Sequence, residues 1–159
     1  MPRATIRTVY CVRPATGTDA GVNQALAGLA AEVLPSQVGG NLLEGLKRLP
    51  NVIAAIDSAR SDPDDLYITT GTQGGRDNAI WPGRGSHGSM RSGQSFAPTI
   101  SLDFATTQNI SLWDYDSVSR DDHLGSIMIQ ASDQGRGEIA KLASSAVEGS
   151  AYYIIYRVD

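Results

Sequence analysis

The chain has 159 residues, of which 41% are apolar and 19% are charged, and its formal net charge is −4. This composition indicates a folded domain with its own core, because disordered chains are poorer in apolar residues. The acidic balance and the lack of a basic tract argue against nucleic acid as a partner. The single cysteine, Cys11, excludes an intrachain disulfide and a zinc site built on cysteines.

Residues 1–5 lack the apolar segment of a secretory signal. Glu32 and Glu44 interrupt the longest apolar stretch of the first half before it reaches the length of a membrane-spanning helix. We therefore expect neither a Sec signal peptide nor a transmembrane helix. A cytoplasmic chain and one exported by a signal-less route both fit this expectation.

Residues 4–12 alternate partly and are rich in β-branched side chains, which predicts a strand. Residues 22–60 then change to helical spacing of their apolar side chains. Within them, Asn41 followed by Glu44 three residues later predicts the start of a short helix, and Pro50 breaks it before a last helical piece. These apolar pieces are interpreted either as a helical hairpin laid against the fold or as a face offered to a membrane, a partner or a second copy.

From residue 66 onward the pattern is β. Alternation between turn-rich segments predicts six more strands, over 66–70, 79–81, 99–104, 109–115, 124–130 and 152–158. Residues 83–95 are predicted to form a loop or a twisted edge, and apolar spacing over 138–147 predicts a short helix. About eight strands at short spacing indicate a mainly β fold. We expect one antiparallel β-sandwich domain over residues 1–159, with a helical insertion at about 22–60.

Four carboxylates lie in the connection between two of these strands: Asp114, Asp116, Asp121 and Asp122. Side chains two apart in an extended segment project the same way, so Asp114 and Asp116 lie together and the return at Asp122 adds a third carboxylate. Like charges held close require a cation, and Ca²⁺ accepts several oxygens in a tolerant geometry. An EF-hand is excluded because its sixth loop position is Ser119 rather than glycine.

Residues 113–125 read Trp-Asp-Tyr-Asp-Ser-Val-Ser-Arg-Asp-Asp-His-Leu-Gly and resemble the third calcium-binding loop of C2 domains. The family pattern is Asp-x-Asp, five residues, Asp, an apolar pair and Gly. Residues 61–68, Ser-Asp-Pro-Asp-Asp-Leu-Tyr-Ile, are similar to the end of the family's first calcium loop, with extra residues. Residues 95–104 are similar to a family strand but lack its Asn and Trp.

The resemblance implies a C2-like sandwich that binds Ca²⁺ and then docks to an anionic phospholipid membrane or to a protein. The implied metal ligands are Asp114, Asp116 and Asp122, while Asp121 is expected to point to solvent. Asp19 or the 62–65 cluster completes the site: Asp65 or Asp62 aligns with the family pattern, and Asp64 is a further candidate. Val118 and Arg120, at the tip of the loop, are expected to touch headgroups or a partner. The alternative is a metal-free assembly protein whose insertion forms a protein–protein interface.

Enzyme motifs are missing from the sequence. It contains no Gly-x-Ser-x-Gly elbow, no His-x-x-x-His pair and no phosphate-binding loop. His87, in a Gly/Ser-rich segment, is interpreted as a loop residue. We therefore expect a binding module rather than an enzyme.

Overall fold

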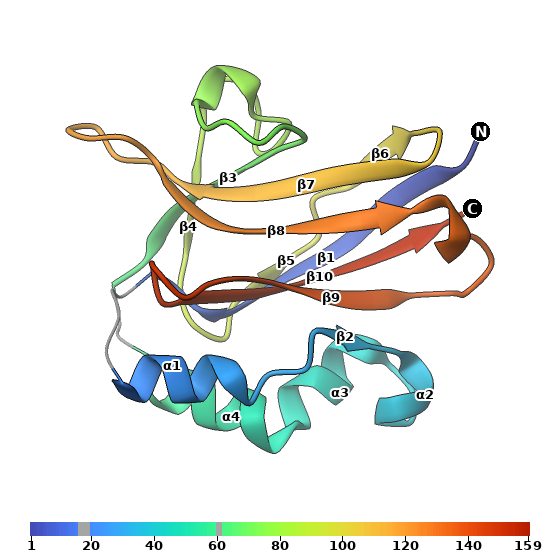
Figure 1. Ribbon diagram of the computed structural model, residues 1–159, viewed down its shortest axis with the longest axis horizontal. Helices are drawn as coiled ribbons and strands as arrows, with labels where there is room; N and C mark the ends of the chain where they lie inside the picture. The colour runs from blue at the N-terminus through green and yellow to red at the C-terminus, as the bar shows by residue number, and fades with distance from the viewer. Residues whose placement is uncertain (16–19, 60–61) are drawn as a thin grey trace.

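Two antiparallel β-sheets lie face to face in the computed structural model, which describes residues 1–15, 20–59 and 62–159 (Figure 1). The larger sheet has the order β2-β9-β10-β1-β5, and β6 also pairs with β1. Its strands are β1 (Arg3–Arg13), β2 (Glu32–Val33), β5 (Ser95–Phe96), β6 (Ile100–Asp103), β9 (Ile139–Ser145) and β10 (Ser150–Val158). The smaller sheet has the order β4-β3-β7-β8. Its strands are β3 (Asp64–Thr69), β4 (Gly88–Met90), β7 (Thr107–Asp114) and β8 (Asp122–Gln130).

The core between the sheets consists of alternate side chains from both. Leu66 and Ile68 of β3 and Ile110 and Leu112 of β7 are fully buried there, as is Ile154 of β10. Successive strand residues point to opposite faces, so this period of two fixes which side chains enter the core. The prediction of a mainly β, antiparallel sandwich with a helical insertion is confirmed.

The helical insertion covers the outer face of the larger sheet (Figure 1). It contains α1 (Ala20–Ala27), α2 (Pro35–Val38), α3 (Leu42–Arg48) and α4 (Pro50–Asp57) as well as β2. Asn41 caps α3 as predicted, since its side chain accepts a hydrogen bond of 3.0 Å from the backbone N–H of Glu44. Apolar side chains of α3 and α4 form a second core with Tyr153 and Ile155 of β10. The apolar face of the insertion is therefore core.

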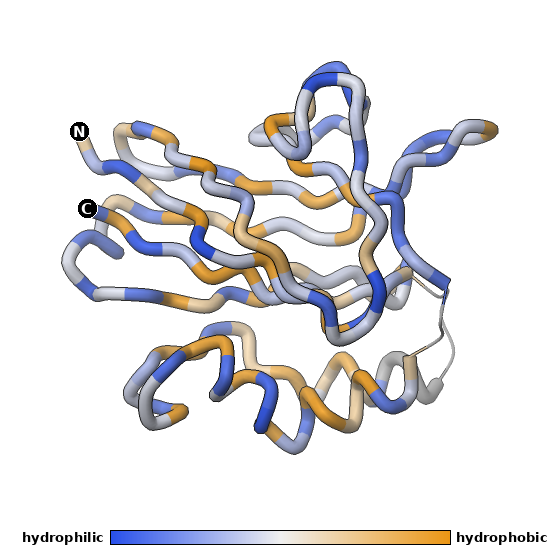
Figure 2. Tube along the Cα trace, turned by 180° about the vertical axis from the view of Figure 1, so that it is seen from behind, coloured by the Kyte–Doolittle hydropathy of each residue, from blue (hydrophilic) through white to orange (hydrophobic). Residues whose placement is uncertain are grey.

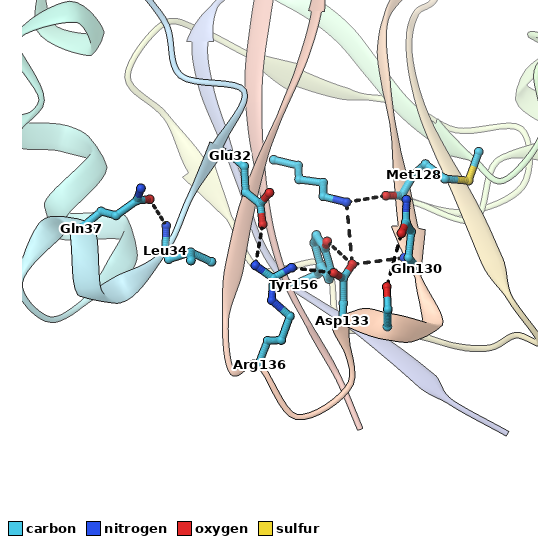
Figure 3. Close-up of polar contacts among 10 residues, drawn as sticks. Glu32, Leu34, Gln37, Met128, Gln130, Asp133, Arg136 and Tyr156 are labelled. Atoms are coloured by element: carbon cyan, nitrogen blue, oxygen red, sulfur yellow. Dashed lines mark hydrogen bonds and ion pairs between the residues drawn. The ribbon is translucent and has the colours of Figure 1, made fainter.

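Polar contacts also hold the insertion in place. The hydroxyl of Tyr153 donates to the carbonyl of Ala30 at 2.7 Å. In the segment that precedes β9, Arg136 bridges Glu32 of β2 at 3.2 Å and Asp133 at 2.9 Å (Figure 3). Asp133 is almost fully buried and also accepts a hydrogen bond of 2.7 Å from the hydroxyl of Tyr156. The bonds from Tyr153 to Ala30 and from Arg136 to Glu32 join the insertion to the rest of the sandwich, so they oppose its detachment.

Two predicted elements are wrong. The helix expected over 138–147 is strand β9, which pairs with β10 along its whole length and with β2 on its other side. Pairing on both edges outweighs the weak helical preference of this segment. The strand expected over 79–81 is reduced to a single bridge between Ile68 and Trp81. Pro82 follows that bridge and has no N–H with which to extend a ladder.

None of the helices within the described ranges has the length and apolarity required to cross a bilayer. The longest, α1 and α4, have eight residues each.

Candidate functional site

The register of the smaller sheet places aspartates at one end of the sandwich. Asp114, the last residue of β7, pairs with Leu66 of β3 on one side and with Asp122, the first residue of β8, on the other. Paired residues of antiparallel strands point to the same face, and Leu66 points into the core. Asp114 and Asp122 therefore lie on the core-facing side of the sheet, where the core meets solvent.

Asp64 lies on this face as well; it belongs to the 62–65 cluster that is expected to complete the site, although Asp65 or Asp62 is the residue that aligns with the family pattern. It alternates with Leu66 and Ile68 on β3, and it is almost fully buried. Its carboxylate accepts hydrogen bonds from the backbone N–H of Ala15, at 2.9 and 3.1 Å, and from the hydroxyl of Tyr152 at 2.6 Å. The alternation with two apolar residues was the signal in the sequence that could have identified it.

The predicted ligand Asp65 points to the opposite face of β3. Its carboxylate lies 3.9 Å from Nε2 of His87. The ring of His87 stacks on that of Tyr115, over which the Arg76 guanidinium lies 3.6 Å from the centroid. The backbone N–H of Asp65 donates to the Asp114 carboxylate at 2.7 Å. Asp65 and Asp114 are thus neighbours whose carboxylates leave the sheet on different sides.

The carboxylate of Asp116 turns back into its own loop. It accepts hydrogen bonds from the backbone N–H of Val118 at 2.8 Å and from the N–H and hydroxyl of Ser119 at 3.2 and 2.8 Å. These bonds, that from Val118 most of all, lower the pKa of Asp116. Such a turn closed by an aspartate side chain is a common loop structure.

The expectation that Asp121 points to solvent is wrong. Its carboxylate accepts hydrogen bonds from the hydroxyl of Tyr67 and, at 3.0 Å, from the backbone N–H of Asp116. The side chain therefore ties the loop between β7 and β8 down onto the sheet. Sequence spacing could not show this, because Tyr67 lies on another strand.

The remaining predicted residues lie at the margin of this end or outside it. Asp62 is exposed just before β3. Asp19 lies outside the described residues. The loop between β7 and β8 forms an arm that projects from the sandwich (Figure 2). In this loop Val118 is 93% exposed and Arg120 is exposed as well. The position predicted for a partner contact is thus accessible.

Burial, and after it the neighbouring carboxylates, raises several pKa values here. Burial first, and then the neighbouring carboxylates of Asp65, Asp122 and Asp116, raise the pKa of Asp114 to about 6. Burial and the charges of Asp116 and Asp121 also raise the pKa of Asp122. In the turn between β9 and β10, burial and the charge of Asp122 raise the pKa of Glu148, which brings a further carboxylate to this end. The end of the sandwich thus holds negative charges that repel one another.

Whether this end can hold a metal depends on charge and on arrangement. Carboxylate oxygens are the ligands that Ca²⁺ prefers, and the repulsion among them is relieved by a cation. However, across residues 1–15, 20–59 and 62–159 no three His, Cys, Asp or Glu side chains are grouped as ligands of one ion. The described residues fit Ca²⁺ in chemistry and charge, while a ligand shell is not assembled from them. Calcium binding stays a prediction.

Comparisons with known proteins leave the family open. No protein-family model and no curated protein matches the chain. Solved structures similar to it include a pair of C2 domains from Extended-Synaptotagmin 2, at 16% identity and a TM-score of 0.34. They also include human GIVD cytosolic phospholipase A2 in complex with methyl gamma-linolenyl fluorophosphonate inhibitor and terbium chloride, at 12% identity and a TM-score of 0.35.

Both matches cover 99% of this chain but only 39% and 17% of the solved chains. TM-scores this low support no conclusion about the family or the activity.

Proposed function

We propose that this chain is a C2-like binding module whose acidic end takes up Ca²⁺ and then docks to an anionic phospholipid surface. The observation that carries the proposal is the placement of Asp64, Asp114 and Asp122 on one face at one end of the sandwich. The raised pKa of Asp114 supports it, because the same burial and repulsion that favour a proton there also favour a bound cation.

The charge of the end explains why docking would depend on calcium. Without a cation, its carboxylates repel a membrane surface that is itself negative. Bound Ca²⁺ would reverse the local charge and offer coordination positions to phosphate oxygens. Val118 and Arg120 would then supply an apolar contact and a cation toward the same surface.

Calcium binding is tested by thermal melting of the whole chain in EDTA and in increasing Ca²⁺. A ligand bound only by the folded state at about 100 times its Kd adds about 2.7 kcal/mol, which raises the Tm of a domain of this size by roughly 5–10 °C. Asp114→Asn and Asp122→Asn should remove most of this shift. Asp103→Asn is the matched control, because Asp103 pairs with Arg3 on a different part of the surface.

The same variants give a second readout in EDTA. Asp114→Asn keeps an oxygen that can accept from the Asp65 N–H but removes a charge from the cluster, so its Tm without calcium should rise. If the Tm of the parent chain at millimolar Ca²⁺ equals its Tm in EDTA, the calcium proposal is wrong and the metal-free assembly protein is favoured.

Membrane docking is tested by co-sedimentation with vesicles of phosphatidylserine and phosphatidylcholine, with Ca²⁺ or EDTA. We expect sedimentation only with both calcium and phosphatidylserine, and a loss of it in Val118→Asp although the calcium-dependent Tm shift persists. Calcium binding without sedimentation would rule out the membrane and favour a protein partner.

A further inference from the structure

A cleft of about 620 Å³ lies between helix α3 and the outer face of the larger sheet. Asn41, Leu43 and Glu44 line it from the helical insertion, while Arg7 and Thr8 of β1 form part of its opposite wall. Its volume is in the range of sites for small molecules, which often lie where two structural units meet. The acidic loop contributes none of its residues to this cleft, so it is independent of the proposed calcium site.

At the cleft the pairing of strand β1 is interrupted on both of its edges. On the β10 side, Ile6 pairs with Tyr156 and Thr8 with Ile155, so Arg7 is an extra residue in a bulge. On the other side, β6 pairs with β1 up to Ile6 and β5 resumes at Val9. Bulges commonly lie beside functional sites, because the extra residue redirects a side chain.

Thr99 lies in the gap between β5 and β6 and lines the cleft with φ of +54°. It is the one non-glycine residue with positive φ in the described part of the chain. A β-branched residue in this left-handed conformation is strained, and such strain is concentrated at ligand-binding sites. Its hydroxyl donates to the carbonyl of Pro98 at 2.7 Å, so the hydroxyl oxygen can still accept a hydrogen bond.

The charges that line the cleft are balanced. Arg7 faces Glu138 at 3.7 Å. Glu44 lies 3.4 Å from the ammonium of Lys47. Because each carboxylate of the wall has a cation beside it, the wall does not select a charged ligand. It offers hydrogen-bond donors and acceptors to a neutral one.

The other groups in the cleft narrow the ligand class. Hydroxyls of Thr5 and Ser101 lie 3.3 Å apart on its wall. Leu43 and Ile155 add apolar surface. Hydroxyls, carboxylates and a guanidinium around a small apolar patch are complementary to a molecule that carries several hydroxyls on a carbon ring.

We propose that this cleft binds a neutral polyhydroxylated ligand, namely a free sugar or the terminal sugar of a glycan. Arg7 and Glu138 would hydrogen-bond the ring hydroxyls, with Thr99 placed by its strained backbone to accept a further bond.

The ligand class is tested by saturation-transfer NMR of the whole chain. The probes are the methyl glycosides of glucose, galactose, mannose and N-acetylglucosamine, with spermidine as a cationic probe and inorganic phosphate as an anionic probe. A printed glycan array distinguishes a glycan end from a free sugar. We expect saturation transfer to at least one glycoside, or binding to a glycan that ends in one. Binding of spermidine or phosphate alone, or of no probe in either format, overturns the proposal.

The location is tested with three variants against whichever sugar binds. Arg7→Gln removes a charged donor and should raise the Kd about tenfold. Thr99→Gly removes the strain and one acceptor, so binding should weaken while the Tm is unchanged or higher.

Thr106→Gly is the matched control, because Thr106 is an exposed bend residue outside the cleft that lacks positive φ. It should lower the Tm and leave the Kd unchanged. A Kd unaffected by both Arg7→Gln and Thr99→Gly places the sugar elsewhere and overturns the proposal.

Discussion

The hydroxyl of Tyr152 on β10 donates a 2.6 Å hydrogen bond across the core to the carboxylate of Asp64 on β3. Both side chains are buried, so a charge on Asp64 lies where water cannot solvate it. Burial first, and then the charge of Asp114, raise the pKa of Asp64 to about 7, although the bond from Tyr152 opposes this. The free energy of unfolding should therefore depend on pH through the protonation of Asp64, which links the two sheets.

Stability in EDTA should rise as the pH falls from 8 to 5.5. Because the pKa of Asp64 is raised in the folded state, the folded chain binds a proton that the unfolded chain does not, and the stabilisation is lost as the pH rises through about 7. The expected gain from this residue is about 2 kcal/mol over that interval. Urea unfolding at several pH values measures it. Asp64→Asn should flatten the dependence, and an identical slope in both proteins would contradict the assignment.

The buried carboxylate of Asp133 should stabilise the fold with the opposite pH dependence: its contribution is lost as the pH falls. Burial raises its pKa, but the bonds from Tyr156 and Gln130, with the charge of Lys141, together lower it below its usual value. Its stabilisation is thus present at neutral pH and is lost as the pH falls through that lowered pKa. Asp133→Ala should cost on the order of 3 kcal/mol at pH 7 by urea unfolding.

The matched control is the exposed ion pair between Arg157 and Asp159. Asp159→Ala should change stability by less than about 1 kcal/mol, because surface pairs are screened by water. Equal losses in the two variants would show that the Asp133 network adds nothing beyond a surface contact.

Gly125→Ala should prevent stable folding. Gly125 lies on β8 with φ of +144°, and a Cβ there would lie 2.5 Å from the carbonyl carbon of Ala143 on β9. The obstacle is backbone of the facing sheet, which cannot move aside, so we expect a loss of at least about 3 kcal/mol. Circular dichroism melting measures it.

Gly93→Ala is the control, because Gly93 has φ of +85° but nothing within 4 Å of an added Cβ. It should cost only the backbone term of about 1–2 kcal/mol. A similar Tm for the two variants would mean that the close approach of β8 to β9 is not rigid.

Leu46→Ala should destabilise the whole sandwich rather than release a separate helical unit. Leu46 of α3 is fully buried in the second core, together with Tyr153 and Ile155 of β10. Truncation of a buried leucine costs about 2–5 kcal/mol. Near-UV circular dichroism and hydrogen exchange of β10 should lose their native signals in one transition. Ile53→Ala, at a residue 44% exposed on α4, should have little effect. A first transition confined to the helices would contradict the shared core.

Much of the fold could be predicted from patterns within short segments of the sequence. The strands that bury alternate side chains could be predicted because the alternation is visible within one short segment, as in Ile110 and Leu112 of β7. The cap at Asn41 is equally local, since it spans three residues. The acidic loop could be found from spacing alone, and the accessible position of Val118 at its tip agrees with its place in the sequence.

Long-range pairing decided the rest. Residues 139–145 became a strand because β2 and β10 offer hydrogen bonds on both edges, which no local pattern records. The same holds for the acidic end, where Asp64 rather than Asp65 joins Asp114 on the core side and Tyr67 holds Asp121. The sequence by itself determined that acidic residues gather near the strand ends and which strands bury alternate side chains. Only the tertiary structure decided which carboxylates face one another, because their spacing depends on the register between strands about 50 residues apart.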